Sequence, residues 1–177
     1  MYSKNYKTFF LMITISANLS GFYMGFQMLL LNALASEFGY LHGKGTWFSV
    51  YTSFFAFGGL IGWILCYKLM QKIGRYYCIL LQNIIGTFGA LLSFFIYHTY
   101  VFVIGRALCG ISWGFIPFSS LFYIKEIIPS AYSSRYLSSF HLFLLCGNIC
   151  PWIIVPLCSD TITISLTTVI PILMNGV

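Results

Sequence analysis

Charged residues are scarce in this chain of 177 residues, and acidic ones are the scarcest. Aspartate and glutamate together number 3, against 9 lysines and arginines; charged residues make up 7% of the chain and hydrophobic residues 59%. A soluble domain of this size has too little interior to bury so much apolar surface. The net charge of +6 does not form a basic stripe interleaved with aromatic residues, so nucleic acid is not an expected partner.

Residue groupings that would indicate an enzyme or a metal site are absent as well. His42, His98 and His141 fall in different segments, and no Ser/His/Asp set, HExxH motif or pair of aspartates lies in an apolar run. Cys146 and Cys150 are one helical turn apart, but no further metal ligand is nearby in the sequence, which favours core packing. We therefore expect no catalytic residue, no metal and no cofactor.

Long uncharged runs occupy most of the chain. Residues 8–36, 45–67 and 76–105 each form a run long enough to cross a bilayer as a helix. A transmembrane barrel does not fit, because its strands would alternate polar and apolar residues, and a cleaved signal peptide is disfavoured by the length of the first run. We predict an all-α integral membrane protein with five to six transmembrane helices. The expected segments are an N-terminus at 1–7, helices at 8–34, 46–67, 77–97, 100–124 and 136–158, and a partial sixth helix at 161–177.

The basic residues predict the orientation in the membrane. With a cytoplasmic N-terminus, only Lys44 and Arg106 lie toward the outside, which satisfies the positive-inside rule. Anionic lipid of the inner leaflet would attract the other basic residues, so the bilayer itself is an expected partner. These inner residues are Lys4, Lys7, Lys68, Lys72, Arg75, Lys125 and Arg135.

Polar and small residues recur inside the first and fourth runs. A stripe of such residues inside lipid must face protein or water. In the first run this stripe serves either close packing of helices or the lining of a cavity. Arg106, just inside the fourth run, must either extend to the outer headgroups or find a partner. The stripe comprises Asn18, Gly21, Gly25 and Asn32.

The fifth run places polar side chains on one face of a helix. His141, Leu145, Asn148 and Trp152 follow one another at i, i+4, i+7 and i+11. Imidazole, amide and indole groups together offer hydrogen-bond donors, acceptors and a stacking plane, as a bound polyhydroxyl compound requires. The alternative is hydrogen bonding between helices.

The end of the fourth run resembles a signature of the sugar porters, a branch of the major facilitator superfamily. That signature reads Pro-x-Tyr-x-x-Glu-x-x-Pro, followed by Arg-Gly and then by a substrate-contacting Gln seven residues after that Gly. Tyrosine, glutamate and the second proline are present here, whereas the first proline and the Arg-Gly pair are replaced. The matching positions are Leu121, Tyr123, Glu126, Pro129, Ser133 with Ser134, and His141.

Three further motifs occur in the order in which sugar porters have them. GFYMGFQ at 21–27 resembles Gly-Tyr-(Asp or Asn)-x-Gly of helix one, and GRALCGISWG at 105–114 resembles the start of helix four. QKIGRYY at 71–77 is similar to the loop Asp-Arg-x-Gly-Arg-Arg, with Gln71 in place of the acid and Tyr76 in place of the last Arg. The likeness covers residues from about 20 to 150, and it implies that residues 8–177 form a partial N-terminal bundle.

The resemblance implies transmembrane transport of a hexose-like sugar through alternating access. The side chains predicted to bind the sugar are those of His141, Gln27, Asn148 and Trp152. Charged groups at helix ends would form a network that holds one conformation until substrate shifts the balance. The residues of this predicted gating network are Glu126, Arg75, Lys72, Arg135 and Arg106.

The resemblance also bears on energy coupling. Proton-driven sugar porters carry an aspartate in helix one, and the matching position here is Tyr23. No acidic residue lies in the middle of any expected span, so a carboxylate that could titrate within the membrane is missing. We therefore expect a uniporter, which moves its sugar downhill by facilitated diffusion.

Sugar porters have two bundles of six helices with the sugar between them, and this chain supplies one. The resemblance thus implies a fragment or half of a transporter, which pairs with a second half-transporter or with a second copy. The plasma membrane is the location that it implies. The alternative is a degenerate, non-transporting membrane scaffold or regulatory partner of a full transporter.

Overall fold

The computed structural model of the chain describes residues 4–33, 45–93, 95, 98–127 and 130–157. Within these ranges the secondary structure is helical, as predicted. The expected sixth helix at 161–177 lies outside the described residues. The helices are α1 (Lys4–Ala33), α3 (Gly45–Ile73), α4 (Arg75–Ser93), α5 (Thr99–Ile127) and α6 (Ser130–Leu157).

Helices α3 to α6 are the ones that suit a bilayer by length and composition. The segments Ser49–Ile73, Arg75–Ser93, Thr99–Ile127 and Ser133–Ile154 are each long and apolar enough to cross it. Large apolar side chains on their outer faces are exposed, such as Phe57 at 67%. Such a surface is stable against lipid and not against water. The chain is an integral membrane protein.

The helices extend past the uncharged runs at the end of the bundle where α1 begins. Helix α1 begins at Lys4, inside the expected N-terminal segment 1–7, and α3 continues to Ile73, six residues past its expected end. Lys68 and Lys72 are exposed on this added part of α3. Because long basic side chains reach water from a helix, charge marks the edge of the apolar zone and not the end of the helix.

The predicted end of the third expected helix at residue 97 is wrong. Helix α4 ends at Ser93 and α5 already begins at Thr99. The amide of Phe95 donates to the carbonyl of Leu92, and the amide of His98 donates to that of Phe95, both over 3.1 Å. Hydrogen bonds between residues three apart are typical of tight turns. Such turns let the chain reverse direction in the few residues between α4 and α5.

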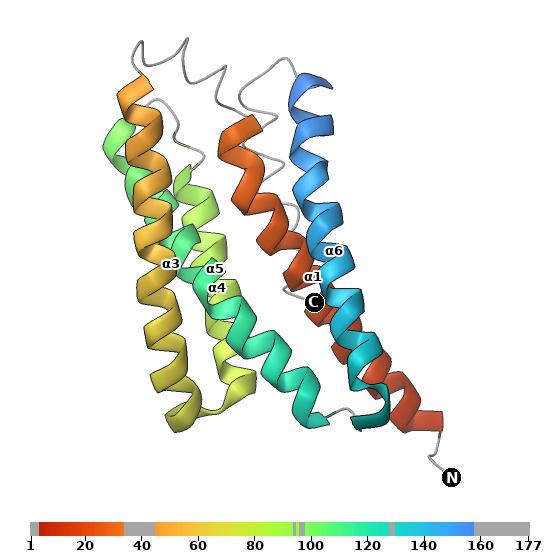
Figure 1. Cartoon of the computed structure of the whole chain (residues 1–177). Helices are drawn as coiled ribbons and strands as arrows, with labels where there is room; N and C mark the ends of the chain where they lie inside the picture. Colours follow the sequence, from red (N-terminus) through yellow and green to blue (C-terminus); the bar gives the residue numbers. More distant parts are fainter. Residues whose placement is uncertain (1–3, 34–44, 94, 96–97, 128–129, 158–177) are drawn as a thin grey trace.

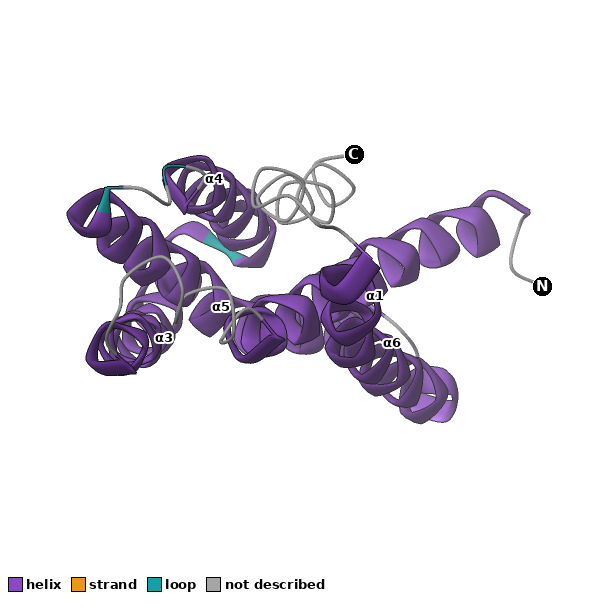
Figure 2. Cartoon of the chain, turned by 90° about the horizontal axis from the view of Figure 1, so that it is seen from above, coloured by secondary structure: helices purple, strands orange, loops and turns teal. Residues whose placement is uncertain are grey.

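The bundle consists of two groups of helices. Figures 1 and 2 show α3, α4 and α5 together on one side, and α1 beside α6 on the other. The most extensive contacts join α3 to α5, α4 to α5, and α1 to α6, whereas α5 makes a smaller contact across to α1 and a still smaller one to α6. The contact between α1 and α5 is therefore the seam between the two groups.

Glycine allows the closest helix approaches inside each group. A Cβ atom on Gly110 of α5 would overlap the backbone carbonyl of Phe55 in α3, and one on Gly58 of α3 would overlap that of Ala107. In the other group, Gly25 of α1 meets the backbone of α6 in the same way. Small residues let membrane helices pack backbone to backbone, which is the main source of their association.

Candidate functional site

Arg106 is buried at the seam between the two groups of helices. Its side chain is 2% exposed, although it carries a charge. Its Nη1 donates a hydrogen bond of 2.9 Å to Oε1 of Gln27, and its Nη2 donates one of 3.3 Å to the backbone oxygen of the same residue. The guanidinium carbon lies 4.7 Å from the centre of the Phe55 ring, a cation–π contact. One side chain thus ties α5 to both α1 and α3.

The placement of Arg106 corrects its grouping with the other charged residues. Arg106 lies twenty residues before Glu126 in the same helix, which is a separation of about 30 Å. It is also enclosed by protein and does not extend to the membrane surface. The structure therefore does not bring Arg106 together with Glu126 and Arg75, because its partner is an amide on another helix.

Gln27 is likewise placed differently from its prediction as a sugar ligand. It is 0% exposed, and its Oε1 is taken by Arg106. Gly25, two residues earlier, faces α6, where an added Cβ would lie 2.9 Å from the amide nitrogen of Asn148. Residues two apart in a helix point to opposite sides. The structure therefore does not bring Gln27 together with the polar side chains of α6, and it does not offer Gln27 to a substrate.

A second buried polar cluster joins α4 to α5 and was not predicted. The hydroxyl of Ser119 donates to Oε1 of Gln82 over 2.7 Å, and that of Ser112 donates to the Gln82 backbone oxygen over 2.9 Å. Tyr23 is also buried, and its hydroxyl would lie 3.2 Å from a Cβ placed on Gly86. The sequence offered one signal for this cluster, which is Gln82 within an apolar run. An amide inside the membrane forms its hydrogen bonds with other helices, so such a glutamine indicates a polar contact between helices.

Helix α6 carries the face predicted to bind a sugar. His141 is exposed, Trp152 is 55% exposed, and Asn148 is half-buried. The Oδ1 of Asn148 is buried and has no hydrogen-bond partner among the described residues, so Asn148 does not share the exposed face. Ser139, also on α6, faces α1 and donates over 3.1 Å to Oδ1 of Asn18. The face with His141 and Trp152 is therefore left uncovered by the described helices.

An ion pair joins α4 to α5 at the end of the bundle where α1 begins. Arg75 pairs with Glu126, and both side chains are partly exposed. Gly74, with a φ of 92°, is the residue between α3 and α4, and this φ supports the tight turn that brings Arg75 into place. Lys72 and Arg135 are exposed, and neither makes an ion pair within the described part of the chain.

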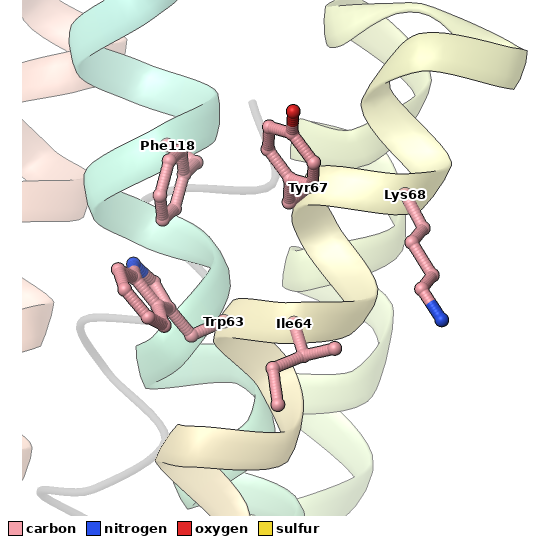
Figure 3. A pocket seen from close by; sticks show the side chains of 5 residues that line it. All are labelled: Trp63, Ile64, Tyr67, Lys68 and Phe118. Atoms are coloured by element: carbon pink, nitrogen blue, oxygen red, sulfur yellow. The ribbon is translucent and has the colours of Figure 1, made fainter.

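A separate hollow of about 330 Å³ lies between α3 and α5. Figure 3 shows the rings of Trp63, Tyr67 and Phe118 lying close together, while the side chain of Lys68 extends away from them. The ring centres of Trp63 and Phe118 are 5.4 Å apart. An apolar lining without hydrogen-bonding groups suits a hydrocarbon more than a sugar, so this hollow is not the candidate sugar site.

The sequence as a whole matches one family of membrane proteins. Residues 10–174 match the family described as sugar (and other) transporter, which is most of the chain. The chain belongs to this family. The resemblance to the sugar porters inferred from four short motifs is thereby confirmed.

Two plant members of the sugar transporter family are similar to this chain. "Probable inositol transporter 3" from Arabidopsis thaliana is 25% identical over 147 residues, which are 80% of this chain and 25% of that protein. "Sugar transport protein 1" from the same plant is 27% identical over 99 residues, 56% of this chain and 19% of that protein. The chain therefore spans a quarter or less of the length of these relatives.

Solved structures of a bacterial sugar transporter share the fold. The inward-open xylose transporter XylE from E. coli superposes with a TM-score of 0.82 at 16% identity, over 94% of this chain and 47% of that one. XylE bound to 6-bromo-6-deoxy-D-glucose superposes with a TM-score of 0.85 at 15% identity, over 96% and 44%. At such identities the likeness concerns the fold alone, and it covers less than half of the transporter.

Proposed function

We propose that the chain forms one half of a transporter that carries a hexose-like sugar across a membrane by alternating access. The observation that carries this proposal is the uncovered face of α6 with His141 and Trp152, in a bundle that has the fold of a sugar transporter half. A sugar needs donors, acceptors and a flat apolar surface to stack on, and this face provides all three. The relatives are named as transporters of sugar, inositol and xylose, which supports a sugar-like substrate.

The second half of the pathway would come from another bundle. In this proposal the His141 face of α6 lines one wall of the cavity, and either a second half-transporter or a second copy of the chain supplies the other. The N-terminus faces the cytoplasm, so that Arg75 and Glu126 lie at the inner end of the pathway. The plasma membrane is the proposed location, on the resemblance alone.

Facilitated diffusion is the proposed mode of transport. Tyr23 stands at the position that the resemblance matches to the aspartate of proton-driven sugar porters, and Arg106 is held by the neutral amide of Gln27. Among the described residues Glu126 is the only acid, and it lies at the end of α5, in the ion pair with Arg75. Without a carboxylate that titrates between the two membrane faces, a proton has no carrier to accompany the sugar.

The test is uptake of radiolabelled hexose into cells that lack hexose transporters of their own. Cells expressing the chain, alone and together with the C-terminal half of Sugar transport protein 1, are compared with cells expressing that half only. We expect saturable uptake that is unchanged when a protonophore collapses the proton gradient. Uptake that falls with the gradient would contradict the uniport mode. No uptake in either combination would contradict transport and favour a scaffold.

His141 provides the sharpest test of the α6 face. Replacing His141 with alanine is expected to raise the half-saturating hexose concentration about five- to tenfold, which is the value of one hydrogen bond of about 1 to 1.5 kcal/mol. His141→Gln should restore most of the affinity, because the amide also donates and accepts. Leu142→Ala is the matched control, since Leu142 is 62% exposed one residue further along. If the His141→Ala and Leu142→Ala variants had the same half-saturating hexose concentration, His141 would not be a sugar ligand.

The ion pair of Arg75 with Glu126 is proposed as a latch at the inner end. Because both groups are partly solvated, the pair contributes up to about 1 kcal/mol, enough to bias two nearly equal conformations about fivefold. Glu126→Gln should therefore speed alkylation of Cys78, which is buried beside α3 and α5 near the pair, up to about fivefold.

The control for the latch is Lys72→Gln, which removes an exposed charge that makes no ion pair in the described residues. The charge-swapped variant with Arg75→Glu and Glu126→Arg should return alkylation of Cys78 to the rate of the unaltered chain. The latch assignment fails if the swapped variant stays as reactive as Glu126→Gln, since the effect would then not depend on pairing.

A further inference from the structure

Two hydrogen-bond donors at the seam between α1 and α5 are buried and have no acceptor among the residues that the structure describes. They are Nε of Arg106 and Nε2 of Gln27. Their positions follow from the bonds already made. Oε1 of Gln27 accepts from Arg106, which turns the amide so that its NH₂ group points elsewhere. Both side chains are at least 98% buried, so water outside the bundle does not satisfy these donors.

The hydroxyl of Tyr23 is a third buried polar group at this seam, and it lies beside the side chains of Ser112 and Cys109. Tyr23 lies four residues before Gln27, and residues at this spacing occupy the same face of a helix. That face of α1 is the one turned toward Arg106. Buried donors without acceptors are rare in folded proteins, and a bound ion or water molecule is one explanation for them.

The charge of Arg106 has no counter-charge within the described part of the chain. Its neighbours are the amide of Gln27 and the ring of Phe55, and neither carries a negative charge. Within the described residues the acid is Glu126, about 30 Å further along α5 and already paired with Arg75. A buried guanidinium without a counter-charge is strongly disfavoured in a membrane protein, and a bound anion would remove that penalty.

We propose that Arg106 and Gln27 form a binding site for a monovalent anionic group. The anion accepts hydrogen bonds from Nε of Arg106 and Nε2 of Gln27, and its charge neutralises the guanidinium. Two sources share this chemistry, namely an inorganic ion such as chloride and the carboxylate of a sugar acid. This proposed anion site does not depend on the proposed sugar transport. The buried charge of Arg106 needs a counter-charge whether or not the chain transports a sugar.

The experiment measures thermal unfolding of the purified full chain in detergent, followed by tryptophan fluorescence. Sodium chloride and sodium glucuronate are each titrated against sodium isethionate at constant ionic strength, because the sulfonate of isethionate is neither a halide nor a carboxylate and accepts hydrogen bonds weakly. Saturation of the site is expected to raise the unfolding midpoint by about 4 °C or more. A shift with chloride identifies an inorganic ion, and a shift with glucuronate alone identifies a carboxylate.

Gln27→Glu is the decisive variant, because it places a carboxylate on the atom that now holds Arg106. The internal charge should replace the anion, so the midpoint should be higher in isethionate and should no longer respond to chloride or glucuronate. Lys68→Gln, which removes an exposed cation of α3, is the matched control and should respond as the unaltered chain does. The proposal is overturned if the unaltered chain responds to neither salt, or if Gln27→Glu responds as strongly as the unaltered chain.

Discussion

Replacing Gln27 with leucine is expected to destabilise the chain by about 3 kcal/mol, because it removes an acceptor from a buried positive charge. Leucine fills a similar volume, so the loss comes from the bond between Gln27 Oε1 and Arg106 and not from a cavity. The Nη1 group of Arg106 would remain buried without an acceptor. The measurement is the unfolding free energy in mixed detergent micelles.

The double variant with Gln27→Leu and Arg106→Met separates the charge from the packing. Replacing both partners of a buried polar pair by apolar groups is often neutral, so this variant should recover most of the lost stability. Gln71→Leu is the matched single change, and it should alter stability by less than about 0.5 kcal/mol, because Gln71 is exposed on α3. If Gln27→Leu costs no more than Gln71→Leu, the bond to Arg106 does not stabilise the bundle.

The helices were largely predictable, because their signal is local. Uncharged runs mark apolar zones, and the observed helices contain most of each expected range. The ends were less predictable, since the end of a helix depends on its connections. Helix α3 continues past Lys68 because exposed lysines are compatible with a helix, and α4 stops at Ser93 because the chain must turn before Thr99.

The candidate site shows where sequence reasoning stops. The polar face of α6 follows from periodicity within one helix, and it could be read directly. The partner of Arg106 could not be predicted from the sequence, because Gln27 lies 79 residues away and the pairing depends on how α1 and α5 cross. The same limit explains why the sequence grouped Arg106 with Glu126, because the partner of a charged side chain depends on how the helices pack.

The two groups of helices differ in how they are held together. Within each group, backbone meets backbone at glycine, which leaves little freedom to slide. Between the groups, the seam of α1 and α5 has fewer contacts and includes the bond from Arg106 to Gln27. Polar bonds can exchange partners at less cost than interlocked backbones, so movement within the half-bundle is expected at this seam.

The glycine contacts can be tested at Gly110. Gly110→Ala is expected to cost about 3 kcal/mol, because the new methyl group would overlap the backbone carbonyl of Phe55 and the two helices would have to separate. Gly59→Ala is the matched change on the other side of the same contact. There the nearest atoms, 3.1 and 3.4 Å away, belong to the Trp113 side chain, which can turn aside, so the loss should stay within about 1 kcal/mol.

Unfolding free energies of the two alanine variants, measured in the same mixed micelles, decide whether α3 and α5 form a rigid pair. A large loss for Gly110→Ala with a small one for Gly59→Ala would mean that contact between the backbones sets the distance between the helices. Equal losses would contradict this, since an interface held by side chains would respond alike at both positions. A rigid pair of α3 and α5 would then confine rearrangement to the α1 seam, where the buried charge of Arg106 is held by an amide.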